Sequence, residues 1–275
     1  MKRLIILLIA MLFVACAKKP PDDNNECLCC EEAFDKLNTG GYYFANCEEM
    51  LDTVGLGLKL YSFVPFTDEE WKQTSYDYKL KRRQIPEEFL SEMTAKELFY
   101  QYFYCDLNTL FMFNTFQQGF ESDKRMNMLP ELLNRSNAGH VLLELLRKVD
   151  PSKINRSDCF RWDFELQIIL AQLEVINRMT DEDIDNYIIE QMRCHDVIRL
   201  LSLCDEENWK YPGSARLILF GLGNVMIRYE FEPFMQSLFR HPDTNEVIWD
   251  PMFIKKEYAL QVIDYVEQFI KNKKK

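Results

Sequence analysis

The sequence predicts an all-α protein, and three observations lead to this prediction. Apolar side chains recur at helical spacing in several long segments, and threonine-based capping sequences precede three of the expected helices. Glycine is scarce, with 9 residues against 20 phenylalanines and 13 tyrosines, which disfavours a β-sandwich because that fold requires many tight turns. Hydrophobic residues make up 47% of the chain, which is enough for a substantial core.

The first residues have the pattern of a secretory signal peptide, which we assign to residues 1–15. Lys2 and Arg3 form a positive n-region, and an apolar h-region follows from Leu4 to Ala15. This apolar run is too short for a membrane-spanning helix, which needs ~20 apolar residues. The alternatives are a transmembrane anchor and a plain secreted protein in which the cysteine that follows has no role.

The junction after this segment, Val14-Ala15-Cys16, resembles the lipobox of bacterial lipoproteins. Phe13 departs from the leucine that usually stands three residues before the cysteine. The resemblance implies cleavage before Cys16, a diacylglycerol thioether on Cys16, and an acyl chain such as palmitate on the new N-terminus. Two or three acyl chains give stable attachment, whereas one chain binds reversibly. We therefore expect lipidation at Cys16 and a place in the bacterial cell envelope, at the periplasmic or surface face of the outer membrane.

Residues 16–30 are expected to form a flexible tether, because two prolines and several charges leave little apolar surface to pack. The acidic residues Asp22-Asp23 and Glu26 resemble the export signals that follow the lipidated cysteine in surface lipoproteins of Bacteroidetes-type bacteria. Lys18-Lys19 lies closer to the cysteine and departs from that pattern.

Capping sequences mark the starts of the expected helices. Thr67–Glu70, Thr94–Glu97 and Thr180–Asp183 each place a hydroxyl at the N-cap and a carboxylate three residues later, where it can accept from the free backbone amide. Ile85–Glu88 is a further start, with a proline at a position where the backbone N–H would have no hydrogen-bond partner within the helix.

Behind these caps, apolar residues recur at the spacing of a helix face. The expected faces comprise Trp162, Leu166, Ile169, Leu170, Leu173 and Ile176; Ile184, Tyr187 and Ile188; Val197, Leu200, Leu201 and Cys204; and Ala259, Val262, Ile263, Val266, Phe269 and Ile270.

The pattern divides the mature chain into two parts. Residues 31–84 predict an irregular N-terminal region, in which Leu58–Phe66 is either a short strand or the end of a buried helix. Residues 85–275 predict a helical domain, whose short breaks favour antiparallel helix pairs. Stacked pairs predict an irregular α-solenoid of the HEAT or armadillo kind. A multi-helix bundle is the alternative, because no repeat of fixed period is present.

From residue 85 onward four features stand out, namely Ile85-Pro86, Met93-Thr94, Gly119-Phe120 and the break Arg135–Gly139. In these features the sequence resembles a group of uncharacterised exported proteins of Bacteroidetes-type bacteria. The features cover about a quarter of the chain, and the resemblance implies no activity.

The charge balance limits the partners. The full chain has a net charge of −11, and without residues 1–15, which hold two basic and no acidic residues, it is −13. Such a charge argues against nucleic acid and anionic lipid surfaces as partners. We expect a membrane association through the lipid anchor, and a protein, peptide or glycan as the ligand of the helical body.

No pattern of catalytic, cofactor-binding or metal-ligating residues emerges from the sequence. His140, His195 and His241 have no second histidine at helical spacing, which leaves a helix-borne metal site without support. His195 is expected to be solvated, because it lies opposite the face of Val197–Cys204. Gly221-x-Gly223 lies in an apolar run and predicts close helix packing rather than dinucleotide binding. The acidic run 181–185 is interpreted as a helix first turn that complements the helix dipole.

The aromatic stretch Phe99–Phe120 has two interpretations, a binding platform for a sugar or peptide and packing between helices. We favour packing, because so dense a set of aromatic side chains would otherwise form an unusually large exposed patch.

The cysteines fall into two groups. Cys105, Cys194 and Cys204 lie in apolar helical patterns and are expected to be buried free thiols. Any disulfide is expected among the N-terminal cysteines, which are Cys27, Cys29, Cys30 and Cys47.

Together these observations predict a lipid-anchored cell-envelope protein whose helical body binds or scaffolds another molecule. The alternative is an envelope-processing hydrolase that uses dispersed acidic residues.

Overall fold

The protein is all-α in the computed structural model, which describes residues 51–107, 115–148, 157–203, 213–240, 247–249 and 256–273. Thirteen helices and one pair of two-residue strands lie within these ranges. The prediction of an all-α fold is therefore confirmed.

The elements follow one another with short connections. In the N-terminal half the helices are α4 (Asp68–Gln73), α5 (Tyr76–Lys81), α6 (Glu87–Leu90), α7 (Ala95–Phe103), α8 (Phe116–Asp123), α9 (Met128–Asn134) and α10 (Ala138–Leu146). In the C-terminal half they are α11 (Ser157–Leu170), α12 (Leu173–Ile176), α13 (Asp181–Leu203), α14 (Gly213–Arg228), α15 (Glu232–Met235) and α16 (Lys256–Lys273). Strands β1 (Phe239–Arg240) and β2 (Val247–Ile248) pair antiparallel, with Phe239 opposite Ile248.

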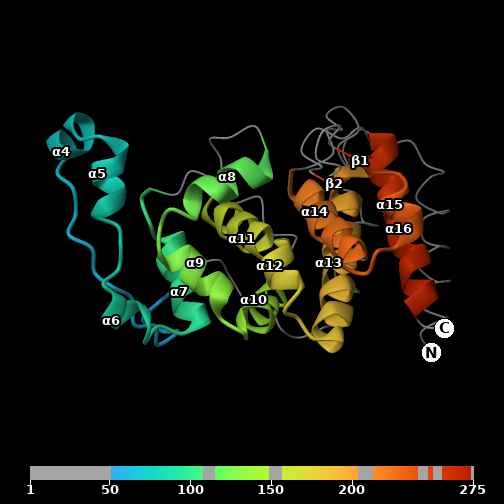
Figure 1. Ribbon diagram of the computed structural model, residues 1–275, viewed down its shortest axis with the longest axis horizontal. Helices are drawn as coiled ribbons and strands as arrows, with labels where there is room; N and C mark the ends of the chain where they lie inside the picture. The colour runs from blue at the N-terminus through green and yellow to red at the C-terminus, as the bar shows by residue number, and fades with distance from the viewer. Residues whose placement is uncertain are drawn as a thin grey trace, which may run out of the picture.

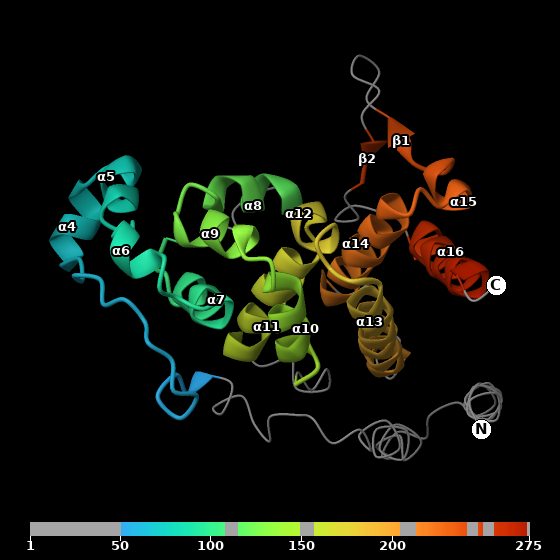
Figure 2. The ribbon, with the colours of Figure 1, turned by 60° about the horizontal axis from the view of Figure 1, so that its bottom comes forward.

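The helices are arranged along one long axis in nearly the order of the sequence (Figure 1). Helices α4 and α5 lie at one end, and α15 and α16 lie at the other. Helix α14 packs against α11, α12, α13, α15 and α16, and Figure 2 shows it beside α13 and α16. None of the described helices has the length and apolar character that crossing a membrane requires.

The predicted caps are confirmed. Thr67 accepts from the amide of Glu70 at 3.2 Å, and the amide of Thr67 donates to the Glu70 carboxylate at 2.9 Å. Thr94 and Glu97 form the same reciprocal pair at the start of α7. Thr180 accepts from the amide of Asp183 at 3.1 Å at the start of α13.

One predicted helix face is divided between two helices. The stripe from Trp162 to Ile176 was expected to be continuous, but α11 ends at Leu170 and α12 begins at Leu173. The break exposes the carbonyl of Ala171, and the side-chain amide of Asn224 on α14 donates to it at 2.7 Å. A partner from another helix thus satisfies the backbone group that the break releases.

The segment before α7 contains two short helices and an extended stretch. Residues 58–66 have no regular secondary structure, and side chains of α7 hold them in place. The Gln101 amide accepts from the backbone N–H of Tyr61 at 2.6 Å and donates to its carbonyl at 3.2 Å. Glu97 accepts from the amide of Lys59 at 2.9 Å. These side chains replace the hydrogen bonds that a neighbouring strand would supply.

The aromatic stretch is mostly core where the structure describes it. Six of its aromatic side chains are buried, and Tyr104 is half exposed; the buried ones are Phe99, Tyr100, Tyr102, Phe103, Phe116 and Phe120. Packing between helices is therefore the correct interpretation for these residues.

Two of the three thiols predicted to be buried and free are confirmed, namely Cys105 and Cys194. Burial raises the pKa of Cys105 to about 11, so the thiol is inert at neutral pH. Cys204 and the N-terminal cysteines lie outside the described residues.

The glycines of α14 mark two close contacts, as predicted. A Cβ at Gly221 would meet the hydroxyl of Tyr187 on α13, and a Cβ at Gly223 would lie 2.2 Å from the indole nitrogen of Trp249. That nitrogen donates to the carbonyl of Phe220 at 3.0 Å, which fixes the ring against α14.

Substitution Gly223→Ala is therefore expected to displace Trp249 and to break its hydrogen bond. We expect the free energy of unfolding to fall by roughly 1–3 kcal/mol in urea denaturation, the usual cost of overpacking. Gly139→Ala is the matched control, because its Cβ would meet only the flexible side chain of Met179 and Val175 beside it. An equal loss in both variants, or none in Gly223→Ala, would contradict the close contact.

Candidate functional site

Helix α11 carries two buried acidic side chains in the middle of the core. Asp163 and Glu165 are 1% and 0% exposed, and Gln167 is fully buried on the same helix. Helices α7, α8, α10, α12 and α14 all pack against α11, which leaves these side chains without contact with solvent. Buried carboxyls are costly unless they are paired, hydrogen-bonded or protonated, so their surroundings decide their chemistry.

Glu165 faces a second buried acid. Arg161, one turn earlier, donates from Nε to Oε1 of Glu165 at 2.7 Å. Tyr102 of α7 donates its hydroxyl to Asp123 of α8 at 2.7 Å, and Asp123 is fully buried. Burial raises the pKa of Glu165 to about 8, with the charge of Asp123 adding to the rise and Arg161 opposing it. The same burial, with Asp123 and Glu165 nearby, raises the pKa of Tyr102 far above its ordinary value.

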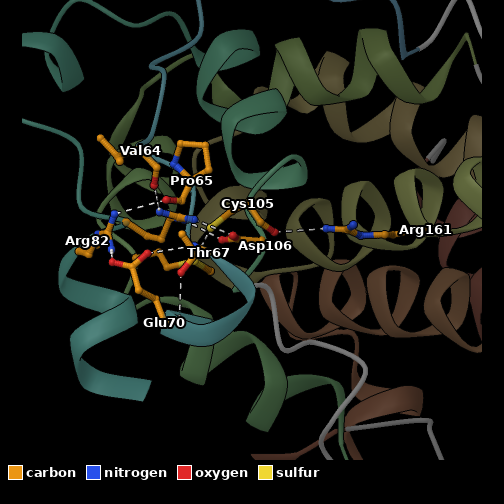
Figure 3. Close-up of polar contacts among 10 residues, drawn as sticks. Val64, Pro65, Thr67, Glu70, Arg82, Cys105, Asp106 and Arg161 are labelled. Atoms are coloured by element: carbon orange, nitrogen blue, oxygen red, sulfur yellow. Dashed lines mark hydrogen bonds and ion pairs between the residues drawn. The ribbon is translucent and has the colours of Figure 1, made fainter. Parts of the chain in front are cut away.

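Two arginines hold the turn after α7 from opposite sides. Arg161 donates from Nη2 to the carbonyl of Phe103 at 2.7 Å and reaches that of Cys105 at 3.5 Å (Figure 3). Arg83 forms a bidentate pair with Asp106, with both N–O distances 2.6 Å. The Arg83 side chain is almost fully buried, whereas that of Asp106 is half exposed.

The extended segment of residues 58–66 is bound to the same group of side chains. Arg83 also donates to the carbonyl of Val64 at 3.1 Å, and Arg82 pairs with Glu70 at 3.2 Å (Figure 3). Arg83 and Arg161 bind the turn Phe103–Asp106 together, and Arg83 also binds the extended segment. The turn thus connects that segment to α11.

Asp163 occupies the other side of α11. Gln167 donates to its Oδ1 at 3.3 Å, and Gln191 of α13 donates to Oε1 of Gln167 at 2.7 Å. Burial raises the pKa of Asp163 to about 7, while Gln167 and the charge of Arg193 oppose the rise. Raised pKa values of this size are typical of functional carboxyls, and also of structural ones that are deeply buried.

The exposure of one histidine differs from the prediction. His195 is 1% exposed, so the prediction that it is solvated is wrong. Helix α13 packs against both α10 and α14, which covers more than one face, and His195 continues the buried stripe of Ile184, Tyr187 and Gln191. His140 is exposed and pairs with Asp183 at 2.9 Å, which raises its pKa. His241 lies outside the described residues.

Within the described ranges, no group of three or more His, Cys, Asp or Glu side chains is placed to hold a metal ion. The lipidation site predicted at Cys16 and the tether lie outside those ranges. The chain has no significant match among protein-family models, curated proteins or solved structures.

The chemistry that this site can perform is therefore the binding and release of protons. Both carboxyls have pKa values close to neutral, and both are enclosed by packed side chains. The sequence held a signal for them that we did not use: Asp163 and Glu165 alternate with Trp162, Phe164 and Leu166 in a stretch that is apolar on several helix faces. Acidic residues within a helix that is apolar all round are buried by necessity.

The contact of Arg161 with Glu165 gives a prediction. Arg161→Met leaves a buried carboxyl and two carbonyls without their donor, so we expect a loss of roughly 1–3 kcal/mol in the free energy of unfolding at pH 7. The double variant Arg161→Met, Glu165→Leu is expected to recover part of that loss, because it leaves no buried carboxyl without a partner. Chemical denaturation of the wild type, the single variants Arg161→Met and Glu165→Leu, and the double variant measures both effects. Losses that simply add would show that the two side chains are not coupled.

Proposed function

We propose that the protein is a lipid-anchored component of the bacterial cell envelope, held at the outer membrane, whose helical body binds or scaffolds a protein, peptide or glycan. The observation that carries the proposal is the Val14-Ala15-Cys16 junction at the end of a signal-peptide pattern. Lipidation of Cys16 would attach the body through the tether of residues 16–30.

The exposed apolar side chains support a binding role. Six of the nine large exposed apolar side chains in the described ranges precede residue 105, and they are Val54, Val64, Trp71, Tyr78, Phe89 and Tyr104. Lys79 lies 4.1 Å from the ring centre of Trp71, and Arg82 and Arg83 each lie 4.3 Å from that of Phe66. Aromatic rings beside cations are well suited to contacts with protein and glycan surfaces.

The alternative is a hydrolase, for which buried acids with pKa values near neutral are the relevant observation. Asp163 and Glu165 have that property, but both carboxyls are enclosed in the core and cannot contact a substrate in this conformation. The binding role is therefore favoured. The net charge of −11 supports a partner other than nucleic acid.

The anchor is tested by replacing Cys16. In Cys16→Ala we expect no incorporation of labelled palmitate and transfer of the protein from the membrane pellet to the soluble or secreted fraction. Cys27→Ser is the matched control, because it removes a nearby cysteine and leaves the junction intact. If the wild type takes up no fatty acid, or if Cys16→Ala stays in the pellet, the protein is not anchored as proposed.

The binding role is tested with a photo-crosslinking amino acid at Trp71 in intact cells. We expect a crosslinked product of defined mass, and its disappearance when Tyr78 is also replaced by alanine. Ile189 on α13 is the control position, since it is 61% exposed but lies in a different part of the chain. Equal crosslinking at both positions, or none at either, would argue against a binding surface in the N-terminal segment.

A further inference from the structure

Three buried side chains connect α11 to α13. Asp163 and Gln167 lie one turn apart on α11, and Gln191 faces them from α13. All three are buried, with exposed fractions of 1%, 0% and 0%. Gln167 is bonded to both of the others, since its amide nitrogen donates to Asp163 and its oxygen accepts from Gln191.

Two atoms of this group lack a hydrogen-bond partner. They are Oδ2 of Asp163 and Oε1 of Gln191, and both are buried. If Asp163 is ionised, both oxygens are acceptors, so they cannot form a hydrogen bond with one another. A buried acceptor without a donor destabilises the folded protein, and a charged one does so more strongly.

We propose that Asp163 is protonated in the folded protein, and that its proton closes a hydrogen-bonded ring of Asp163, Gln167 and Gln191 that fastens α11 to α13. With a proton on Oδ2, the carboxyl becomes a donor, and Oε1 of Gln191 is the acceptor that lacks one. Every hydrogen bond of the ring then has a donor and an acceptor, and the group carries no charge.

The surroundings of Asp163 agree with a neutral carboxyl. Arg193 of α13 is the charged side chain that acts on it, and the effect of burial exceeds that of Arg193 and raises the pKa of Asp163 to about 7. The other titratable side chains on the covered face of α13 are Tyr187, Cys194 and His195, and the Tyr187 hydroxyl also interacts with the side chain of Gln191. Among the described residues, α7, α8, α10, α12 and α14 contribute no charge to this pKa. Glu165 instead faces Arg161 and Asp123.

The ring makes the connection between α11 and α13 sensitive to pH. The unfolded chain loses this proton near pH 4, whereas the folded chain retains it to about pH 7. The contribution of Asp163 to stability is thus complete below pH 4, decreases as the pH rises from 4 to 7, and is constant above that range. At alkaline pH the ring contains a bare carboxylate beside an amide oxygen, so the two helices are held less firmly.

Asp163→Asn tests the inference on the full chain, because the asparagine amide supplies a permanent donor of nearly the same shape. We expect the ratio of the unfolding constants of wild type and Asp163→Asn to rise about 50-fold between pH 5 and pH 7, nearly tenfold in the first pH unit and about fivefold in the second, where Asp163 of the folded protein begins to ionise. Glu165→Gln is the matched control, since it removes a different buried acid and should leave the Asp163 contribution in place. A ratio that stays constant with pH would overturn the proposal.

A spectroscopic measurement keeps the inference testable if Asp163→Asn does not fold. The wild type at pH 6 should show the infrared band of a protonated carboxyl, assigned to Asp163 by ¹³C-aspartate labelling and NMR titration. In Gln191→Met the band should move to the frequency of a carboxyl with a weaker hydrogen bond. A wild-type Asp163 that titrates at the ordinary value for aspartate, or a band that Gln191→Met leaves unchanged, would show that no ring is formed.

Discussion

The burial of α11 on all sides is the constraint on which the rest of the structure depends. Five helices pack on α11, and a sixth helix, α13, is joined to it by the hydrogen bond from Gln191 to Gln167. A helix in this position cannot direct its polar residues to water. Asp163 and Glu165 instead find partners one turn away on α11, in Gln167 and Arg161. These partners in turn bond to Gln191 of α13 and to the carbonyl of Phe103 at the end of α7, which links α11 to both helices.

The N-terminal end is held together differently. Helix α4 has no buried residue, and α5 buries only Leu80 among the described side chains. Cohesion there comes from ion pairs such as Arg83–Asp106, from cations over aromatic rings, and from the amide of Asn127, which donates to the carbonyl of Ile85 and accepts from its N–H. Such contacts are individually weak and are partly screened by salt, so this end is expected to open before the core does.

The parts of this structure that the sequence could predict are the local ones. Capping boxes and the apolar stripe of α16 depend on residues three to seven positions apart, and both were predicted correctly. His195 was placed wrongly because its phase was taken from the residues that follow it rather than from Ile184 and Tyr187, which precede it. The break after Leu170 was not predicted, because Asn224, which satisfies the carbonyl that the break releases, lies far away in the sequence.

The buried acids show why the candidate site was not predictable from the same signals. A carboxyl in a helix ordinarily indicates a solvated face. For Asp163 and Glu165 that inference fails, because α11 is apolar on several faces and five helices pack against it. Burial has a physical consequence for the two carboxyls. A solvated carboxyl is stable in either protonation state, whereas a buried one is stable only when it is neutral or has a cation beside it. Arg161 donates to Glu165, and in the proposed ring the amide oxygen of Gln191 accepts from a protonated Asp163. Two acids two residues apart on one helix are thus stabilised by different means, because they face different neighbours.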